Sequence, residues 1–459
     1  MRAAAPFALA FAALVAAGGC DSSGTVVTTH PAYWNVSHGF LRDADGRAVI
    51  MRGANVGNKA KPYFDFQQAA DFHRMRDDWG MNAIRFLVLW AGVEPSAGQY
   101  DDAYLEGVAQ RIEWARDAGV LVVLDMHQDV YGEGFASGGG DGAPLWTCDL
   151  AHYAAFKPAD QWFFNYLSPE VTACVDGLYA SPDLRAHYTE AWRRLARRLA
   201  QYENVVGFDP MNEPPWGSAP YSGFEETTLQ PFYVDVARGV REVAPHFVAF
   251  LEPSASRNLG RATGLTKFPF ADVVYAPHSY DTDAERGNGF DPVAGRPRVL
   301  ANVGALSDEA KSLDAALWIG EYGGYGNGIA EYMTAQYDGI GAVAGSSMYW
   351  AYGRGGGYSM LDADGSERHP LVDTLVRPYP ERVAGDPISY AYDAATSTFT
   401  LTYTPDASVT APTLVSVPAR VYPNGYTVDC GGCTSEKIPG GLKITRAPNG
   451  NPAVVTLHP

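Results

Sequence analysis

The strongest constraint on the fold of this chain is a repeated alternation of short apolar runs with amphipathic helical stretches between residues 35 and 380. The runs are apolar throughout, which is typical of parallel strands buried on both faces, and the helical stretches supply the crossovers between them. About eight such units predict an α/β fold of the (β/α)8 TIM-barrel type. The expected strands are Ala48–Met51 (followed by Arg52–Asn55), Asn82–Trp90, Val120–His127, Val205–Glu213, His246–Leu251, Val273–Ala276, Ala316–Gly320 and Gly345–Trp350.

An open, doubly wound sheet is the alternative arrangement of the same elements. We disfavour it because no Gly-rich phosphate-binding loop follows any of the expected strands. In a barrel, the carboxyl ends of all strands meet at one mouth, where active sites lie. Packing alone does not account for the many functional side chains at these strand ends, which are Arg85, His127, Asn212, Glu213, His278, Tyr280, Glu321 and Trp350.

A second domain is expected after the barrel. The Pro-rich segment 377–387 has the composition of a linker. Beyond it the apolar pattern changes to period two, as in Ser389–Tyr392 and Phe399–Tyr403. Roughly seventy residues of this texture predict a small C-terminal β-sandwich. We therefore expect the catalytic barrel over residues 35–380 and the β-sandwich over residues 381–459.

The N-terminus has the pattern of an export signal. Arg2 precedes an apolar run from Ala5 to Ala17 that is too short for a typical spanning helix, so residues 1–20 are expected to be a signal peptide. The segment Ala17–Cys20 resembles a bacterial lipobox, which predicts a lipoprotein held at the cell envelope through Cys20, with residues 21–34 as a tether. The alternative is an ordinary signal peptide cut nearby, which releases a secreted protein and leaves Cys20 incidental.

Four further cysteines remain in the expected mature chain. An even number in an exported protein predicts disulfides. Cys148 with Cys174 would close a long insertion, and Cys430 with Cys433 would close a tight turn. A CxxC segment can also be a redox or half-zinc motif, but neither a second CxxC nor a nearby pair of histidines accompanies it. We therefore expect no metal there.

The charge balance limits the binding partners. The formal net charge is -18, which repels phosphate backbones and argues against nucleic-acid binding. The same charge repels anionic headgroups, so contact with a membrane or micelle needs apolar side chains or a covalent anchor. Aromatic residues gather in the insertion 132–174, where they either line an apolar substrate channel or only pack the loop onto the barrel. They are Trp146, Tyr153, Phe156, Trp162, Phe163, Phe164 and Tyr166.

Two glutamates carry the expected chemistry. Glu213 lies in Asp209–Pro215 and Glu321 lies in Trp318–Gly324, and each follows a buried apolar run. A carboxylate at such depth needs a function or a partner, because burying it alone is costly. Retaining glycosidases place two carboxyls about 5 Å apart, one as acid and base and the other as nucleophile. The alternative is a pair of salt-bridged glutamates in the core.

Three residues near the glutamates have expected supporting roles. Asn212 is expected to hold the sugar 2-hydroxyl, a contact that strengthens toward the transition state. Arg85 and Tyr280 are expected to hydrogen-bond Glu321 and to keep it ionised with a lowered pKa. Glu213, as the acid, must begin the reaction with a proton.

The remaining strand-end residues are expected to contact the sugar. His127 and His278 would bind sugar hydroxyls or orient the glutamates, although a histidine at a strand end is often only structural. Trp350 would stack on a sugar face, and its alternative is a place in the barrel core. The histidines are not spaced as a metal site, and double displacement at two carboxylates needs no metal or other cofactor.

The strand-end residues, taken together, resemble the active-site set of glycoside hydrolase family five, and the likeness extends over roughly residues 35 to 459. Within that family, three segments resemble endoglycoceramidases: Leu124–Tyr131, Asp141–Trp146 and Leu371–Pro380. The resemblance implies that Glu213 is the acid/base and Glu321 the nucleophile.

The resemblance also implies residues that contact the sugar. These are Lys61, His127 and Asp129, with Lys59 as a rival for the role of Lys61. The acid motif departs from the family pattern, because prolines flank it where Leu and Phe are usual. This departure leaves the preferred glycan and aglycone open.

The function implied by the resemblance is hydrolysis of the bond between an oligosaccharide and ceramide in glycosphingolipids, with net retention. Two rivals share the glutamates: a β-glucosidase acting on glucosylceramide or steryl glucoside, and a polysaccharide endoglucanase. A non-catalytic surface lectin is a different class, but silent relatives usually lose a catalytic carboxylate. The β-domain and the aromatic insertion favour a lipid-like aglycone. We expect a monomer that acts on a glycolipid or other glycoside at a membrane or micelle surface.

Overall fold

The computed structural model describes residues 34–285, 288–447 and 451–459. The predicted signal peptide, Cys20 and the tether up to residue 33 lie outside the described residues. Among the helices of the described ranges, none is both long enough and apolar enough to cross a bilayer.

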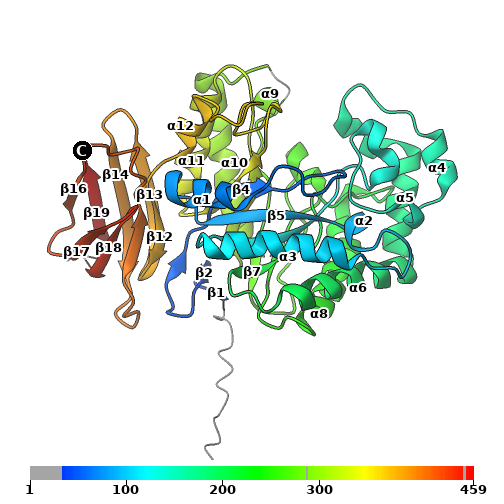
Figure 1. Ribbon diagram of the computed structural model, residues 1–459, viewed down its shortest axis with the longest axis horizontal. Helices are drawn as coiled ribbons and strands as arrows, with labels where there is room; N and C mark the ends of the chain where they lie inside the picture. The colour runs from blue at the N-terminus through cyan, green and yellow to red at the C-terminus, as the bar shows by residue number, and fades with distance from the viewer. Residues whose placement is uncertain (1–33, 286–287, 448–450) are drawn as a thin grey trace, which may run out of the picture. The chain divides into compact units, whose positions relative to one another are not determined.

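Eight parallel strands close into a barrel, as the sequence pattern predicts (Figure 1). The barrel closes where β11 pairs with β4, with Ser347 opposite Arg52. The strands are β4 (Arg52–Val56), β5 (Ala83–Leu89), β6 (Leu121–His127), β7 (Val205–Asp209), β8 (Val248–Leu251), β9 (Val273–Tyr275), β10 (Ala316–Tyr322) and β11 (Ser346–Tyr352).

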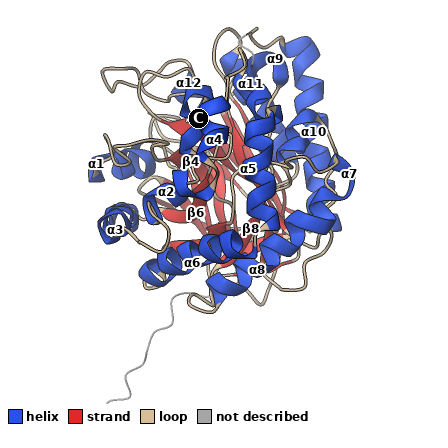
Figure 2. Cartoon of the chain, turned by 90° about the vertical axis from the view of Figure 1, so that its right-hand side faces the viewer, coloured by secondary structure: helices blue, strands red, loops and turns tan. Residues whose placement is uncertain are grey.

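Helices surround the barrel (Figure 2). Several of the long helices begin at a capping residue: Asp101 accepts a hydrogen bond from the Tyr104 amide at 3.0 Å, and Ser181 accepts one from the Leu184 amide at 3.2 Å. The long helices are α3 (Asp102–Asp117), α5 (Pro169–Ala180), α6 (Pro182–Leu199), α8 (Gln230–Arg241), α10 (Pro292–Ser312) and α11 (Ile329–Ala342). The short ones are α1 (Ala69–His73), α2 (Trp90–Val93), α4 (Leu150–Ala155), α7 (Tyr221–Phe224), α9 (Thr282–Glu285) and α12 (Leu371–Leu375). Single 3₁₀ or π turns are η1 (Arg74–Asp78), η2 (Glu133–Gly138), η3 (Leu145–Thr147), η4 (Trp162–Leu167), η5 (Glu225–Leu229) and η6 (Ala255–Leu259).

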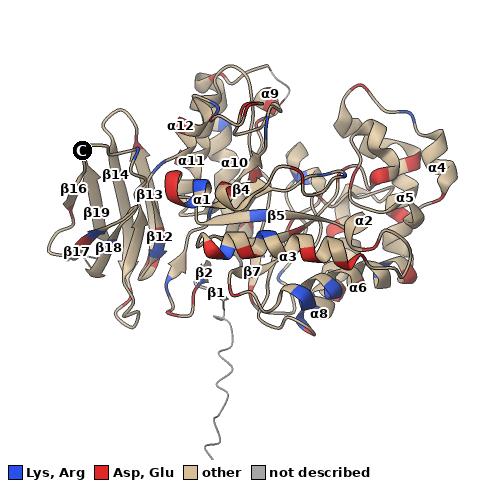
Figure 3. Ribbon diagram, viewed as in Figure 1, with Lys and Arg blue, Asp and Glu red and all other residues tan. Residues whose placement is uncertain are grey.

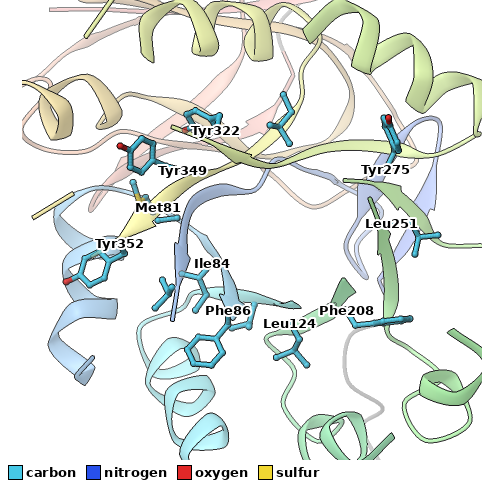
Figure 4. Close-up of a cluster of buried hydrophobic side chains, with 14 of the residues drawn as sticks. Met81, Ile84, Phe86, Leu124, Phe208, Leu251, Tyr275, Tyr322, Tyr349 and Tyr352 are labelled. Carbon is cyan, nitrogen blue, oxygen red and sulfur yellow. The ribbon is translucent and has the colours of Figure 1, made fainter. Parts of the chain in front are cut away.

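The strand side chains divide between two cores. Outward-facing residues such as Ile84, Phe86 and Leu124 pack against the helices (Figure 4). Inward-facing residues such as Val123 and Trp318 belong to a separate apolar cluster within the barrel. This alternation leaves the carboxyl ends of the strands free to carry polar side chains.

Two antiparallel sheets are built mainly from the C-terminal part of the chain, so the predicted β-domain is confirmed, and β1–β3 from the N-terminal end complete one of them (Figure 1). The seven-stranded sheet has the order β1 (Asn35–Ser37), β2 (Phe40–Arg42), β3 (Ala48–Val49), β12 (Tyr379–Val383), β15 (Thr413–Ser416), β18 (Gly441–Arg446), β17 (Thr434–Ile438). The four-stranded sheet has the order β13 (Gly385–Asp393), β14 (Thr398–Pro405), β19 (Ala453–His458), β16 (Thr427–Asp429).

One predicted strand is wrong. The run Ala48–Met51 does not open the barrel, because Val49 pairs with Arg382 of β12 in the seven-stranded sheet. The first barrel strand is β4, and β12 itself occupies part of the predicted linker 377–387. Ala48 and Val49 are almost fully buried, so their apolar pattern is the same as that of a barrel strand.

Both predicted disulfides are present. Cys148 is bonded to Cys174 across 26 residues, and Cys430 to Cys433 across three. The first bond ties the start of the insertion after β6 to α5. The second closes a tight turn.

Candidate active site

A buried arginine lies at the centre of the barrel mouth. Arg85 of β5 points inward and is fully buried. Its guanidinium contacts four carboxylates, those of Asp125 (2.9 Å), Asp209 (2.9 Å), Glu252 (2.8 Å) and Glu321 (2.7 Å). Burial by itself would lower the pKa of Arg85, but these carboxylates hold it well above its usual value. Arg85 is therefore a fixed positive charge that anchors the carboxylates around it.

Glu321 is the next-to-last residue of strand β10 and belongs to this network. It accepts hydrogen bonds from Arg85 Nη1 at 2.7 Å and from Tyr280 Oη at 2.8 Å, which are the two contacts expected from the sequence. The expected lowering of its pKa is wrong, because burial raises the pKa of Glu321 above its usual value despite the nearby His278 and Arg85 cations. Only 5% of Glu321 is exposed, and the loss of solvation at that depth outweighs the two cations.

Glu213 lies just after β7 on a strained turn. Its backbone has a φ of 38°, a left-handed conformation that non-glycine residues seldom adopt. Two buried side chains hold this conformation: Glu252 accepts a hydrogen bond from the Glu213 amide at 2.9 Å, and Gln128 donates to the Glu213 carbonyl at 3.1 Å. The turn therefore places the carboxyl group of Glu213 in the mouth of the barrel.

The carboxyl group of Glu213 is held through one oxygen. Its Oε1 accepts from Asn258 Nδ2 at 2.7 Å and interacts with His278 Nδ1 at 2.8 Å. Because both partners meet Oε1, the other oxygen is the one on which a transferable proton can sit. Burial alone would lower the pKa of His278, but Glu252 and Glu321 hold it well above its usual value, so the ring is an imidazolium.

The spacing of the two glutamates decides between the two glycosidase mechanisms. One oxygen of Glu213, one oxygen of Glu321 and a ring nitrogen of His278 all lie within 4.8 Å of one another. Retaining enzymes hold their carboxyls about 5 to 5.5 Å apart, whereas inverting enzymes need about 6.5 to 9.5 Å to admit a water. The geometry therefore fits double displacement through a covalent intermediate.

Glu252 connects the surroundings of both glutamates. It bonds Arg85, approaches His278 Nε2 at 3.3 Å and accepts from the Glu213 amide. Burial would raise the pKa of Glu252, but His278 and Arg85 lower it, so this carboxylate is ionised. Burial and the neighbouring Glu252 raise the pKa of Asp209 well above its usual value, although Arg85 opposes that shift.

Sequence reasoning missed several members of this network: Asp125, Gln128, Asp209, Glu252 and Asn258. A signal existed for some of them. Asp125 and His127 are two residues apart on β6 and so face the same side, and Glu252 directly follows the apolar run of β8. Asn258 lies in the η6 turn, and nothing in its local sequence predicts its contact with Glu213.

A second polar cluster lies beside the glutamates and consists of Lys59, His127, Asp129, Asp141 and Trp350. One predicted member of the site, Lys61, is not part of it. Lys59 is bonded to Asp129 and lies 4.5 Å from the centre of the Trp350 ring. The predicted Lys61 is exposed, and its ammonium lies over Tyr63. The loop after β4 thus brings Lys59, and not Lys61, to the site. Sequence alone could not decide this, because the course of the loop determines which lysine turns inward.

His127 joins this cluster to the barrel interior. Its ring stacks on Trp350, with centroids 5.2 Å apart and planes 10° apart. Nδ1 contacts Asp125 at 2.7 Å, and Nε2 lies 3.7 Å from Asp129. Burial would lower the pKa of His127, but Asp125 and Asp129 raise it to about 9. The ring is therefore a cation over the neutral pH range.

Asp141 completes the second cluster. Burial and the neighbouring Asp129 raise its pKa to about 7, although Lys59 opposes that shift. Its Oδ1 is buried and has no hydrogen-bond partner among the described residues. A carboxyl group with an oxygen that has no protein partner can accept a hydrogen bond from a sugar hydroxyl.

Two groups of side chains have the spacing of metal ligands. One is His127, Asp129 and Asp141, and the other is Glu213 and Glu321 with His278. In the first, the Lys59 ammonium already bonds Asp129, and in the second the imidazolium of His278 lies between the carboxylates. At both positions a cationic side chain already neutralises the carboxylates. A metal ion there would be repelled by that cation, which disfavours a metal site.

Asn212 is held firmly beside the acid. Its Oδ1 accepts from Arg85 Nη2 at 3.0 Å, and its Nδ2 donates to the Gln128 carbonyl at 3.0 Å. An amide nitrogen carries two hydrogens, so one remains for a sugar hydroxyl. The position agrees with the role expected from the sequence.

The aromatic insertion contains two kinds of residue. Tyr153 and Phe156 both pack edge-on against Phe135, with centroids 4.9 Å apart in each pair. Tyr166 is buried, and its hydroxyl makes a long contact of 3.5 Å with Asp129. Trp162 and Phe164 are exposed. Some rings therefore fix the insertion to the barrel, while others are free for a partner.

The chain matches two family models and is similar to known proteins along most of its length. The Cellulase family (glycosyl hydrolase family 5) matches residues 42–356, and the glycoside hydrolase family 5 C-terminal domain matches residues 377–453. Endoglycoceramidase I of Rhodococcus hoagii (strain 103S) is 26% identical over 451 residues, covering 91% of this chain and 86% of that protein.

Solved structures of endo-glycoceramidase II from Rhodococcus sp. are also similar. Its complex with ganglioside GM3 superposes with a TM-score of 0.82 at 31% identity, covering 92% of this chain and 99% of that one. Its lactosyl-enzyme intermediate superposes with a TM-score of 0.81 at 30% identity and the same coverage.

Proposed function

Since the chain belongs to glycoside hydrolase family 5, we propose that it cleaves the β-glycosidic bond between an oligosaccharide and ceramide in glycosphingolipids. The observation that carries the reaction type is the separation of at most 4.8 Å between oxygens of Glu213 and Glu321. The proposed substrate is supported by relatives that are endoglycoceramidases and that match this chain through both the barrel and the C-terminal domain.

In the first step, Glu213 donates its proton to the glycosidic oxygen while Glu321 attacks the anomeric carbon. The bond to the ceramide oxygen breaks, ceramide leaves as the alcohol, and Glu321 becomes a glycosyl ester. Glu213 is left as a carboxylate, and His278 and Asn258 stabilise that charge through Oε1. Arg85 and Tyr280 hold Glu321 in place for the attack.

In the second step, Glu213 acts as the base. The ester has removed the negative charge from Glu321, so the Glu213 carboxylate can take a proton from water without a neighbouring anion. The water oxygen attacks the anomeric carbon on the face that ceramide left. Two inversions give net retention, and Glu321 is released as a carboxylate.

The glycone is proposed to bind in the second polar cluster. Lys59, Asp129 and Asp141 offer hydrogen-bonding groups, while Trp350 offers a half-buried ring for stacking. Asn212 is placed for the 2-hydroxyl of the sugar at the cleavage site. This division of polar groups supports an oligosaccharide on one side of the scissile bond.

We also propose that the enzyme works outside the cytoplasm. The apolar segment Ala5–Ala17 and the lipobox-like Ala17–Cys20 support export, and the two disulfides agree with an oxidising compartment. Labelling of the wild type, but not of Cys20→Ser, by a radioactive fatty acid would support the lipoprotein form. Absence of label from the wild type would favour a released protein.

The substrate is tested with a mixed panel of gangliosides, globosides, glucosylceramide, cholesteryl glucoside and a soluble β-glucan, with product masses as the readout. The proposal expects an intact oligosaccharide together with ceramide. Cleavage of only glucosylceramide or the steryl glucoside would show that the enzyme is a β-glucosidase. Cleavage of the glucan alone would contradict the lipid-like aglycone.

A further inference from the structure

The insertion after β6 carries a concentration of exposed apolar side chains. Ten large hydrophobic residues are exposed in the described part of the chain, and five of them fall within one stretch of the insertion. We call these five the insertion patch: Leu145 (46% exposed), Leu150 (67%), Trp162 (43%), Phe164 (52%) and Leu167 (52%). Exposed apolar residues gathered in one segment mark an interaction surface more often than scattered ones do.

The insertion patch stands on a fixed support. The Cys148–Cys174 disulfide closes the segment, and Asn165 Nδ2 donates to the Gly138 carbonyl at 2.8 Å. The Asn165 side chain also accepts from the Ala159 amide at 2.7 Å. The exposure of the patch is therefore a property of a folded, cross-linked segment.

The insertion patch is also connected to the sugar-binding cluster. The rings of Trp162 and Tyr166 lie 6.1 Å apart, and the Tyr166 hydroxyl reaches Asp129. Figure 2, which looks toward the barrel strands from one side, shows α4 and α5 of the insertion in front of them. One segment thus links an apolar surface to the residues proposed to hold the glycone.

We propose that the insertion patch docks the enzyme on a lipid–water interface, with Trp162, Phe164 and Leu167 entering the apolar layer. The proposal rests on the proposed function, because it concerns a substrate whose aglycone lies in lipid. The scissile bond of such a substrate adjoins the lipid surface, while Glu213 and Glu321 are only 7% and 5% exposed. The mouth of the barrel must therefore come to the surface, and the apolar insertion is the part suited to contact it.

The charge of residues 145–174 indicates which lipid headgroups the insertion patch can approach. Residues 145–174 contain three acidic side chains and one basic one: Asp149, Asp160 and Glu170 against Lys157. Acidic segments are visible near α4 and α5 in Figure 3. An anionic headgroup would be repelled, so a neutral or zwitterionic surface is the expected partner.

The test compares two triple variants. In the first, Trp162→Ser, Phe164→Ser and Leu167→Ser remove the apolar contact. In the control, Val293→Ser, Ile388→Ser and Val454→Ser remove residues that are exposed by 84%, 47% and 44% outside the insertion. Each variant is assayed on a soluble aryl lactoside and on GM3 in phosphatidylcholine vesicles. Flotation with glycolipid-free vesicles, made of phosphatidylcholine alone or with added phosphatidylserine, reports docking separately.

We expect the patch variant to keep its activity on the aryl lactoside within about two-fold and to lose about ten-fold or more on vesicles, because only vesicle cleavage needs docking. Its flotation should fall as well, while the control matches the wild type in all three assays. Equal vesicle activity of the patch variant and the wild type would overturn the docking surface and leave the proposed function intact. An equal loss in the control would also overturn it, as would wild-type flotation only with anionic vesicles. A wild type that cleaves the lactoside and no glycolipid would overturn the proposed function and the docking surface together.

Discussion

At the scale of single residues, the two glutamates differ in the groups that surround them. Glu321 receives hydrogen bonds from Arg85 and Tyr280 through its two oxygens, whereas Glu213 is held through Oε1 alone. A nucleophile benefits from fixed position, and an acid needs one oxygen that can carry and release a proton. The contacts therefore fit the proposed roles of Glu321 as nucleophile and Glu213 as acid.

The first prediction separates these roles with two alanine variants. Glu321→Ala should lose about 10³-fold or more in kcat on every glycoside, because no ester can form. Glu213→Ala should lose about 10²- to 10⁴-fold on glycolipids. With an aryl glycoside whose leaving group needs no acid, added azide should restore much of the Glu213→Ala rate by attacking the ester. Rescue of Glu321→Ala to the same retained product would contradict the assignment.

The second prediction concerns Glu252 as a positioning residue. Glu252→Gln removes a negative charge that keeps His278 protonated and alters the partner of the Glu213 amide. We expect kcat to fall about 10- to 100-fold with little change in KM, and the basic limb of the pH profile to move to lower pH.

The control for Glu252 is Glu309→Gln. Glu309 is also paired with an arginine, Arg257, and accepts from the Tyr275 hydroxyl at 2.8 Å. That variant should leave the pH profile unchanged. If the basic limb stays in place in Glu252→Gln, the charge of Glu252 does not act on His278.

The third prediction concerns the pH dependence of stability at Asp141. Its folded-state pKa of about 7 lies above the ordinary value of 3.8, so the unfolded chain releases this proton at lower pH than the folded chain. The contribution of Asp141 to folding stability therefore falls as the pH rises from about 4 to about 7. Lys59 and His127 face it as cations, and Asp125 and Asp129 as anions.

Asp141→Asn should remove this fall. The free energy of unfolding of both proteins is measured by urea at about pH 4 and at about pH 7.5. Between these two pH values, the wild type should lose about 2 to 4 kcal/mol more than the variant does. A constant difference between the two proteins would show that Asp141 ionises normally in the folded state.

Site residues on or just after strands could be predicted from the sequence, whereas site residues in loops could not. Arg85, Glu213 and Glu321 follow or lie within apolar strands, where a charge stands out in the sequence. Lys59 and Asn258 lie in loops, where polar residues are common and only the tertiary path brings one of them to the site.

At the scale of elements, seven of the eight barrel strands were predictable because their burial on both faces leaves continuous apolar runs, whereas β4 begins with Arg52 and has no such run. The same signal misled at Ala48–Met51, because β3 is a buried strand of the seven-stranded sheet, where it pairs with β2 and with β12 from the opposite end of the chain. Val49 pairs with Arg382, more than 300 residues later in the chain. Such a pairing depends on the folded structure as a whole, so the local sequence pattern does not reveal it.

The fourth prediction compares the two disulfides as elements. Replacing both Cys148 and Cys174 by Ser should lower the free energy of unfolding by about 3.5 kcal/mol, because the longer loop of the unfolded chain regains more entropy. The matching change at Cys430 and Cys433 should cost about 2 kcal/mol. Urea unfolding of both variants under oxidising conditions measures the difference. A larger loss from the shorter loop would show that chain entropy does not govern their effect.

At the scale of the whole molecule, the two ends of the chain are joined in one sheet. The strands β1–β3 precede the barrel and pair with β12 after it, and Ile50 N donates to the Glu381 carbonyl at 3.3 Å. The Tyr390 hydroxyl further donates to the Gly345 carbonyl of the barrel at 2.8 Å. The C-terminal sheets therefore brace the entry into β4 and β11, the strands that close the barrel.

The most direct test of the central claim follows the released sugar by proton NMR during cleavage of a ganglioside. Retention at the anomeric carbon predicts that the intact oligosaccharide appears first as its β-anomer, together with ceramide, before mutarotation produces the α-anomer. First appearance of the α-anomer would contradict double displacement at Glu213 and Glu321. Release of single sugars in place of the intact oligosaccharide would contradict the proposed bond.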